Sequence, residues 1–262
     1  MKLHNKKLIF FTKYSFNGAS SRYRTFQYID AFNNEGANCK VYTLFNQSYL
    51  DALYEKQKIK KIFYTVISIL KRILNVIFIP KCHLCIIEKE LIPYFPGILE
   101  KFLKIKNIPF ILDYDDAIFD NYERNKIAQF FFKNKIPSII GMSNGVISGS
   151  PYLFDYCKKY NDNTILVPTS INFMEYAKIS NSSSNRLVIG WIGSPYTSRY
   201  IIEILSPLIK IVNEYQCDLH LIGFDRKINN NLLNNKNIKI INWNYDTELT
   251  DISKFDIGLM PL

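Results

Sequence analysis

The chain has 262 residues, more than one ordinary domain and enough for two small ones, and its 48% hydrophobic content suffices for packed cores. A net charge of +10 favours anionic partners such as phosphorylated sugars or acidic lipid surfaces, whereas no RNA- or DNA-binding signature is recognisable and nucleic acid is not expected as a partner. Five cysteines, an odd number in a chain that is not small, make a disulfide framework unexpected.

The chain opens with the pattern of a parallel β-α-β unit. Residues 8–11 form an apolar run that predicts a strand and is too short for a signal peptide, so a cytoplasmic protein is expected. Residues 22–33 carry apolar side chains at helical spacing, and residues 40–44 predict a second strand. Strand, loop, helix and strand in this order indicate the parallel unit.

The loop before that helix is a candidate binding site for an anion. The small residues from Gly18 to Ser21 let a ligand approach the backbone, and a helix N-terminus favours negative charge. Arg22 and Arg24 lie in the first turn, where basic side chains oppose the helix dipole unless an anion binds there. The alternative is a serine cap followed by two solvated arginines. The stretch lacks the G-x-G-x-x-G pattern, so no dinucleotide is implied.

Residues 59–78 predict an amphipathic helix in which a narrow polar stripe lies opposite a wide apolar surface. The stripe contains Lys61, Thr65, Ser68, Arg72 and Asn75, flanked by Lys60 and Lys71, and the apolar surface contains Ile62, Phe63, Val66, Ile69, Leu70, Ile73, Leu74 and Ile77. A helix lying on an anionic membrane with a basic rim fits this pattern, and a helix packed on the sheet fits it equally. A membrane-spanning helix would place two charges near the bilayer centre, at roughly 2.5–3.5 kcal/mol each.

Strands and helices continue to alternate beyond that helix. Strands are predicted at residues 83–87 and 109–113, within 139–147 and at 164–167, and helices at 96–104, 124–133 and 152–159. Ser150 followed by Pro151 is a typical helix start. Cys82 and Cys85 have C-x-x-C spacing without a second pair, so buried structural thiols are favoured over a zinc site, with a redox role as the alternative.

The strand at residues 109–113 ends in the carboxylates of Asp113, Asp115, Asp116 and Asp120. Carboxylates are not buried without partners, so the strand must deliver them to an edge or a cleft. In open α/β sheets, the region beyond the carboxyl ends of the strands is where ligands bind. These residues are therefore candidates for substrate contact, and the alternative is a solvated acidic turn that caps the next helix.

Residues 179–185 are small and polar without periodicity, and they predict a linker. Beyond them the α/β pattern restarts with a strand at 187–192, a tight loop at Gly193 and Ser194, a helix at 199–215 that Pro207 should kink or split, and strands at 219–222, 238–241 and 256–260. We therefore expect an α/β protein with two Rossmann-like domains, at residues 1–180 and 186–262, joined by a linker at 181–185.

Seven stretches of the sequence resemble GT-B glycosyltransferases of family 4, the "glycosyl transferases group 1" type. They are GASSRYR at 18–24, IEKELIPYFP at 87–96, ILDYDDAIFD at 111–120, VISGSPYL at 146–153, VPTSINF at 167–173, LVIGWIGSPYT at 187–197 and FDIGLMPL at 255–262. They occur in the family's order and span nearly the whole chain. The resemblance implies two Rossmann-like domains, of which the first takes the acceptor and the second, incomplete here, takes the nucleotide sugar.

The resemblance further implies transfer of a sugar from a nucleotide-sugar donor to a glycan acceptor, often lipid-linked, in bacterial surface polysaccharide or lipopolysaccharide synthesis. Anomeric configuration is retained, and neither a metal nor a cofactor is needed. Asp115 and Asp116 would be the catalytic residues on the acceptor side. Residues implied to bind donor or acceptor are Gly18, Ser21, Arg22, Arg24, Gly193 and Ser194. An enzyme of this kind would be cytoplasmic and peripheral on the inner face of the membrane, contacting anionic lipid through residues 59–78.

The chemistry of the reaction agrees with these residue types. Expulsion of a nucleotide diphosphate needs positive charge and N–H donors aimed at the departing oxygens, which loop amides and arginine supply without a metal. A carboxylate near the acceptor hydroxyl accepts its proton or positions it.

In the family, a basic segment, a glutamate-containing donor-ribose motif and a returning helix follow the point at which this sequence stops, at Leu262. We therefore expect a fragment or truncated product that is itself inactive. Three other interpretations remain. One is a GT-A type transferase with Asp113 and Asp115 as a metal site, because adjacent carboxylates suit Mg²⁺ or Mn²⁺. Another is a non-catalytic membrane-surface remnant, and the last is a receiver-like phosphoacceptor domain, which rests on fold analogy alone.

Overall fold

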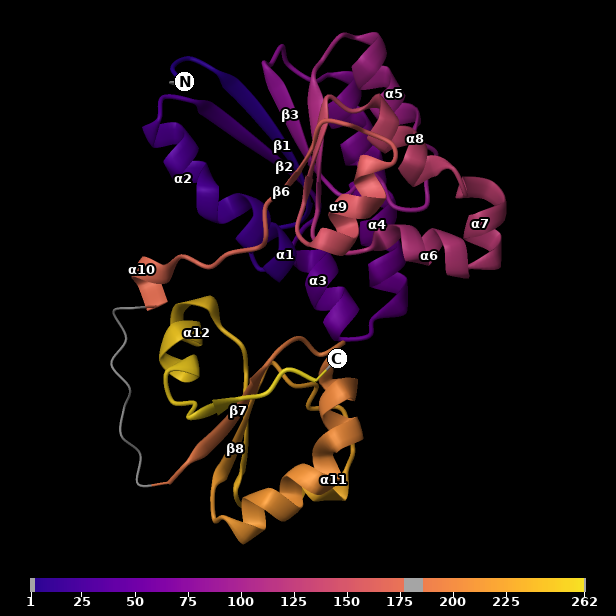
Figure 1. Cartoon of the computed structure of the whole chain (residues 1–262). Coiled ribbons are helices and arrows are strands. Elements are labelled where there is room, and N and C mark those ends of the chain that lie inside the picture. Colours follow the sequence, from indigo (N-terminus) through magenta and orange to yellow (C-terminus); the bar gives the residue numbers. More distant parts are fainter. Residues whose placement is uncertain (1–2, 177–185, 262) are drawn as a thin grey trace. The chain divides into compact units, whose positions relative to one another are not determined.

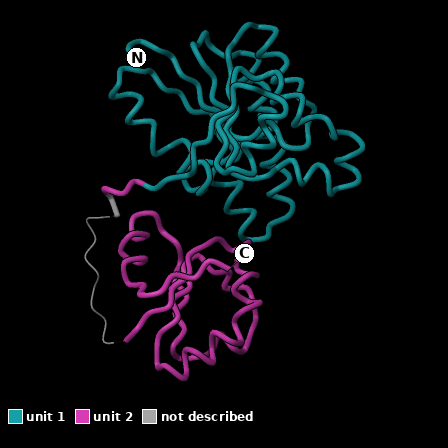
Figure 2. Tube along the Cα trace, in the orientation of Figure 1, with its two compact units in different colours: residues 1–171 teal, residues 172–262 magenta. Residues whose placement is uncertain are grey.

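The computed structural model describes residues 3–176 and 186–261, which form helices and strands along both parts of the chain (Figure 1). The chain forms two compact units, unit 1 at Met1–Ile171 and unit 2 at Asn172–Leu262 (Figure 2). Each unit has its own parallel sheet, so the predicted class, α/β with two Rossmann-like domains, is confirmed. The predicted linker at 181–185 lies outside the described residues.

Unit 1 is built on a six-stranded sheet with the order β2-β1-β3-β4-β5-β6, in which all neighbours are parallel. Its strands are β1 (Lys7–Tyr14), β2 (Asn38–Phe45), β3 (Leu84–Glu88), β4 (Phe110–Tyr114), β5 (Gly145–Ser148) and β6 (Thr164–Leu166). Continuous apolar runs are typical of parallel strands because helices cover both faces of the sheet. In the register, Glu88 lies beside Asp113 and Tyr114 beside Ser148, so polar side chains meet at the carboxyl edge.

Ten helical segments connect these strands. They are α1 (Ala19–Ser21), η1 (Arg22–Phe26), α2 (Gln27–Asn34), α3 (Gln47–Tyr54), α4 (Lys58–Ile77), α5 (Ile98–Ile105), α6 (Ile118–Arg124), α7 (Lys126–Phe132), α8 (Lys135–Met142) and α9 (Pro151–Lys158). The helix expected at 22–33 begins three residues earlier and contains a π-helical turn, η1. The stretch 139–147 holds the predicted strand only at its end, because its first residues belong to α8. The predicted cap is present, since Ser150 accepts a hydrogen bond from the N–H of Leu153.

Helix α4 has the predicted two faces, but its polar stripe is turned towards the protein. Ser68 and Arg72 are 7% and 2% exposed, whereas Ile62, Phe63 and Leu70 on the opposite face are 61%, 59% and 57% exposed. The expectation that Arg72 belongs to a solvent-facing basic rim is therefore wrong. Its guanidinium lies over the Phe11 ring and donates a hydrogen bond to the carbonyl oxygen of Thr12 at 2.6 Å, which supplies the inner face of the helix with a polar partner.

Unit 2 carries a four-stranded parallel sheet with the order β10-β7-β8-β9. Its elements are α10 (Phe173–Tyr176), β7 (Val188–Ile192), α11 (Ser198–Glu214), β8 (Asp218–Ile222), η2 (Asn231–Asn234), β9 (Ile238–Ile241), α12 (Tyr245–Ile252) and β10 (Ile257–Gly258). Pro207 does not split the predicted helix, because α11 runs through it as one element. Ile201, Leu205 and Leu208 pack the apolar side of α11 into the core of the unit.

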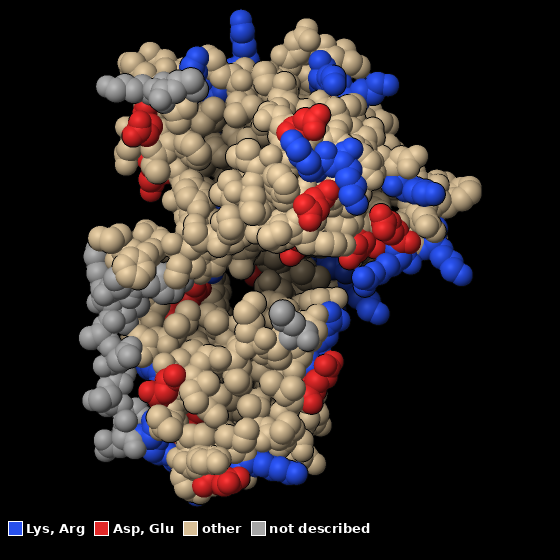
Figure 3. All heavy atoms as spheres, viewed as in Figure 1, with Lys and Arg blue, Asp and Glu red and all other residues tan. Residues whose placement is uncertain are grey.

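Within residues 3–176 and 186–261, none of the helices combines the length and the apolar character needed to cross a bilayer. On the face shown in Figure 3, basic side chains among the described residues are interspersed with acidic ones. The cysteines are free thiols, and Cys85 is buried as predicted, with its sulfur 3.5 Å from that of the half-buried Cys82.

Candidate functional site

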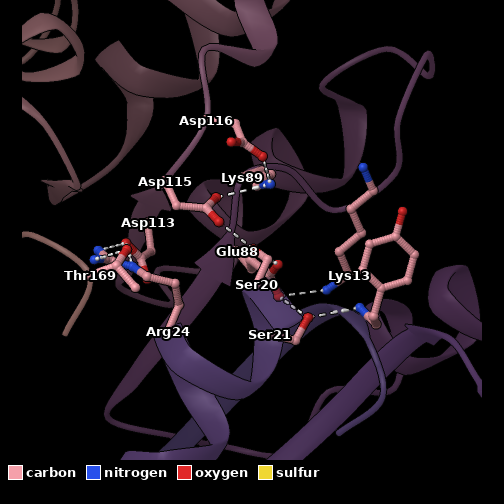
Figure 4. Close-up of polar contacts among 11 residues, drawn as sticks. Lys13, Ser20, Ser21, Arg24, Glu88, Lys89, Asp113, Asp115, Asp116 and Thr169 are labelled. Carbon is pink, nitrogen blue, oxygen red and sulfur yellow. Dashed lines mark hydrogen bonds and ion pairs between the residues drawn. The ribbon is translucent and has the colours of Figure 1, made fainter. Parts of the chain in front are cut away.

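The polar cluster of unit 1 lies at the carboxyl ends of β1, β3 and β4 (Figure 4). In the sheet, β2 lies on one side of β1 and β3 lies on the other. The order in which the chain adds strands therefore reverses between β1 and β3. In open parallel sheets, the carboxyl side of such a reversal is where ligands bind. The cluster collects side chains from segments that are far apart in the sequence, from Lys13 to Thr169.

Glu88, the last residue of β3, is the buried centre of one half of the cluster. It is 2% exposed and accepts hydrogen bonds from the N–H of Lys13 at 2.9 Å and from Ser21 Oγ at 2.6 Å. Ser20 Oγ lies 2.9 Å from Glu88, and its single hydrogen is shared between Glu88 and Asp115. A buried carboxylate requires such donors because desolvation is costly. Ser21, predicted as a binding residue, is thus fully buried and holds Glu88 in place. Glu88 was not among the predicted site residues, although its position at the end of a strand was a usable signal.

Arg24 from η1 and Asp113 from β4 form a buried ion pair. Arg24 Nε lies 3.1 Å from both carboxylate oxygens, Nη2 contacts Oδ1, and both side chains are 5% exposed. Arg24 Nη1 also donates to the carbonyl oxygen of Val167 at 2.7 Å. Burial raises the pKa of Asp113 to about 6, although the adjacent Arg24 guanidinium opposes that shift. The arginines at this helix start were expected to attract an external anion. For Arg24, Asp113 of the protein itself supplies that negative charge.

Asp115 and Asp116 follow β4 and share one cation, Lys89. Its Nζ lies 2.9 Å from Asp115 Oδ1 and 2.6 Å from Asp116 Oδ2. The side chain of Asp115 is 15% exposed and accepts a hydrogen bond from Ser20, whereas the Asp116 side chain is 70% exposed. The two predicted catalytic carboxylates are thus brought together but are not equivalent, because only Asp116 is widely accessible to an incoming molecule.

The other two predicted residues of unit 1 serve the backbone and its packing. A Cβ at Gly18 would lie 2.3 Å from Tyr14 Cβ, so the tight turn after β1 needs glycine. Arg22 is 6% exposed, and its guanidinium lies 4.9 Å from the centre of the Tyr23 ring.

In unit 2, the loop that follows β7 carries Gly193 and Ser194 at the point where β8 and β10 flank β7, which is again a reversal of strand order. The N–H of Gly193 donates to the carbonyl oxygen of Ile222 at 3.0 Å, and that of Ser194 donates to Thr197 Oγ1 at 3.0 Å. Gly223 has φ +74° and packs against Gly193, where a Cβ would lie 2.1 Å from the Gly193 oxygen. Both predicted amides therefore have partners, one at the end of β8 and one within the loop.

The candidate metal ligands Asp113 and Asp115 are each engaged with a cationic side chain, Arg24 and Lys89 respectively. Across residues 3–176 and 186–261, no group of three or more His, Cys, Asp or Glu side chains is placed to hold a metal ion.

Replacing Arg24 with methionine is expected to lower the free energy of unfolding by about 2 kcal/mol at pH 7.5, because it leaves the Asp113 charge buried without its partner. The folded pKa of Asp113, about 6, lies above its usual value, so the protonated form is favoured below pH 6. The loss should therefore shrink between pH 7.5 and pH 5 in urea denaturation. Adding Asp113→Asn to Arg24→Met should recover part of the lost free energy of unfolding at pH 7.5. If that loss depends neither on pH nor on Asp113, the proposed pairing is contradicted.

No protein-family model matches the sequence, and no curated protein matches it. Solved structures do resemble it. A glycosyltransferase from Rickettsia africae has a TM-score of 0.60 at 12% identity, covering 97% of this chain and 72% of that one. An α-glucosyltransferase in complex with UDP and a 13-mer DNA has a TM-score of 0.58 at 12% identity, covering 97% and 71%.

A UDP-GlcNAc 2-epimerase from Methanocaldococcus jannaschii has a TM-score of 0.57 at 11% identity, covering 96% of this chain and 77% of the epimerase. Together with the two separate parallel sheets, these likenesses identify the fold as the GT-B arrangement of Rossmann-like domains.

Proposed function

We propose that the protein is a glycosyltransferase that moves a sugar from a nucleotide-diphosphate donor to a glycan acceptor. The single observation that carries this proposal is the pairing of a GT-B fold with an accessible carboxylate, Asp116, at the strand reversal of unit 1. Neighbours with this fold include a glycosyltransferase and an α-glucosyltransferase bound to UDP, which favours a nucleotide sugar as the donor.

In this proposal, unit 1 takes the acceptor and unit 2 the donor. Asp116 contacts the acceptor hydroxyl and accepts or positions its proton, while Asp115 supports it through the shared Lys89. Gly193 and Ser194 bring the loop after β7 to the donor diphosphate. Because their N–H groups already have partners in unit 2, we expect donor binding to rearrange these hydrogen bonds or to use the first amides of α11. Arg22 and Arg24 provide positive charge near the acceptor. Transfer proceeds with retention and without a metal.

A second candidate is a nucleotide-sugar epimerase, because a UDP-GlcNAc 2-epimerase has the same fold at a similar TM-score. Both activities begin by binding a nucleotide sugar, so the fold alone does not separate them. They differ in the product: transfer releases the nucleoside diphosphate only when an acceptor is present, whereas a simple epimerase interconverts two nucleotide sugars.

We further propose that the enzyme works at an anionic membrane surface, on a lipid-linked acceptor, and that α4 contacts the lipid. The outer face of α4 is a continuous apolar surface, referred to below as the α4 apolar face. Its residues, with their exposed fractions, are Ile59 84%, Ile62 61%, Phe63 59%, Val66 52%, Ile67 44%, Leu70 57%, Leu74 54%, Ile77 39% and Phe78 76%. Large exposed apolar surfaces of this kind mark sites of interaction with membranes or proteins.

Charge favours lipid over a protein partner on the α4 apolar face. Lys58, Lys60 and Lys71 are exposed along the same helix, and α4 contains no acidic residue. An apolar face with basic residues at its margin is typical of a helix lying in the plane of an anionic membrane. Burial of Arg72 removes one cation from this margin but leaves these lysines in place. Such an enzyme would act on the inner face of the cytoplasmic membrane, in surface polysaccharide or lipopolysaccharide synthesis.

Calorimetric titration of the complete gene product with UDP tests the donor part of this proposal. Saturable binding that EDTA does not change is expected, because main-chain amides rather than a metal hold the diphosphate. Binding that disappears with EDTA would favour the metal-dependent alternative at Asp113 and Asp115. Absence of binding for UDP and for other nucleoside diphosphates would contradict the donor assignment.

A further inference from the structure

The backbone at Lys89 has a conformation that lysine rarely adopts. Its φ is +62°, in the left-handed region, and the N–H of Glu90 donates to the carbonyl oxygen of Glu88 at 2.8 Å. This bond between residues two apart makes a γ-turn centred on Lys89, of the positive-φ kind that is rare and strained. Strained backbone persists where the surrounding structure holds it, and it concentrates at functional sites. The N–H of Lys89 donates to the carbonyl oxygen of Asp113 at 2.9 Å, which fastens the turn to β4.

The turn sends three consecutive charged side chains in three directions. Glu88 accepts hydrogen bonds from the two serines after β1, Lys89 reaches the two aspartates after β4, and Glu90 pairs with Lys135 and Tyr122. An extended strand would instead send Glu88 and Glu90 to the same face. The γ-turn therefore separates Glu88 from Glu90, and the Lys89 ammonium group reaches Asp115 and Asp116.

The Lys89 ammonium joins one buried carboxylate to one accessible carboxylate. The side chain of Lys89 is 5% exposed, so it offers almost no surface to a ligand. Asp115 Oδ1 lies 2.9 Å from the Lys89 ammonium as an ion pair, without a hydrogen bond of normal geometry, and Oδ2 accepts from Ser20 at 2.5 Å. Asp116 contacts Lys89 through Oδ2 while its side chain remains 70% exposed.

We propose that Lys89 is a positioning residue of the acceptor site, which acts by holding the accessible carboxylate of Asp116 in a fixed place. The proposal rests on the proposed function, because it assigns Asp116 to the acceptor. The ammonium is anchored on its inner side by Asp115, which Ser20 fixes in turn. Holding a reacting group in place contributes to rate because misplacement by about 1 Å can cost on the order of a hundredfold.

Removal of the ammonium has an electrostatic consequence for Asp115, and the role of Lys89 in positioning is tested by kcat against KM. Burial alone would raise the pKa of Asp115, but Lys89, helped by Ser20, holds it below its usual value. Without Lys89, burial dominates, the pKa of Asp115 rises, and the cluster loses its negative charge at a higher pH. The other titratable groups whose fields reach Lys89 or Asp115 are Lys13, Tyr14, Arg24, Asp113 and Asp116, and all of them remain. Glu88, which shares the Ser20 hydroxyl with Asp115, also remains.

Three variants of Lys89 separate the effect of its positive charge from the effect of its strained backbone. Lys89→Met removes the ammonium and keeps the strained turn, Lys89→Gly removes both the ammonium and the strain, and Lys89→Arg keeps a cation. We expect Met and Gly to lower kcat by about a hundredfold, to leave the donor KM unchanged and to move the acidic limb of the pH profile upwards. Lys89→Arg should return the acidic limb of the pH profile part of the way to its position in the unaltered enzyme. Lys135→Met is the matched control, because it breaks another buried lysine–carboxylate pair, with Glu90, outside the acceptor site.

The test uses two readouts on the complete gene product that carries these residues: transfer kinetics and titration of the Asp115 carboxyl by carbon NMR. The proposal predicts that the Asp115 titration moves to higher pH in Lys89→Met and Lys89→Gly but not in Lys135→Met. An unmoved Asp115 titration, or full activity of Lys89→Met, overturns the role of Lys89. If Asp115 responds as expected while the unaltered protein transfers no sugar, the proposed function fails, and with it the assignment to an acceptor.

Discussion

Replacing Asp116 with alanine is expected to lower transfer at least about a hundredfold while leaving the fold intact. Proton acceptance by a positioned side chain is typically worth about 10²- to 10⁴-fold in rate. The side chain of Asp116 is 70% exposed, so its loss removes little packing and should barely change the unfolding transition. The measurement is the rate of nucleoside diphosphate release in the presence of acceptor, together with a thermal melt of each variant.

The matched control for this variant is Asp120→Ala. Asp120 belongs to the same acidic stretch but lies on α6, where it makes a 3.4 Å ion pair with the exposed Arg124. Exposed pairs of this kind contribute little, so the control should keep both activity and stability. Retained transfer in Asp116→Ala would reduce the acidic cluster to a structural turn and withdraw the assignment of unit 1 to the acceptor.

The double substitution Phe63→Glu and Leu70→Glu is expected to weaken binding to anionic vesicles about a hundredfold or more. Each large apolar side chain contributes roughly 1.5–3 kcal/mol when it leaves water, and both are more than half exposed in the protein. The added carboxylates would also be repelled by the lipid headgroups. Co-sedimentation with vesicles containing phosphatidylglycerol measures the effect, and the fold should survive because neither side chain is in the core.

Ile211→Glu provides the matched control for that experiment, since Ile211 is an apolar residue of α11 in unit 2 and is 42% exposed. It should leave vesicle binding unchanged. Neutralising Lys60, Lys61 and Lys71 should weaken binding more at low salt than at high salt, because the attraction of exposed charges is screened. Unchanged co-sedimentation of the double variant would exclude lipid as the occupant of the α4 apolar face. A concentration-dependent dimer that the double variant abolishes would then assign the face to a second copy of the chain.

Periodicity was enough to predict the two faces of α4 but not their orientation. A wide apolar face normally packs on a sheet, and a stripe with Arg72 and Ser68 normally faces water. In this protein the polar stripe of α4 faces inwards. This orientation is stable because the Arg72 guanidinium packs on the Phe11 ring and donates a hydrogen bond to the carbonyl oxygen of Thr12, which lies 60 residues earlier on β1. No local pattern contains this partner. Among the residues that the structure describes, no carboxylate forms an ion pair with the Arg72 guanidinium, and burial lowers the pKa of Arg72 to about 9.

In the candidate site, the acidic residues could be predicted from the sequence, but their partners from distant segments could not. Carboxylates directly after an apolar strand identify a sheet edge, so Asp115 and Asp116 were found from the sequence. Their partners were not, because Ser20 and Lys89 come from two other segments and meet the aspartates only when β1, β3 and β4 align. The left-handed backbone of Lys89 could not be predicted either, since lysine carries no preference for it. The arginines after Gly18 were recognised as needing an anion, but Asp113 lies 89 residues away from Arg24.

The most direct measurement of the central claim follows a panel of nucleotide sugars incubated with the complete gene product and acceptor-bearing membranes. Liquid chromatography with mass spectrometry resolves the nucleotide products, and NMR resolves the anomeric configuration of the transferred sugar. Sugar transfer predicts release of a nucleoside diphosphate that requires acceptor, with the donor's configuration retained in the product. Conversion of one nucleotide sugar into its epimer without such transfer, or no turnover of any donor, would contradict it.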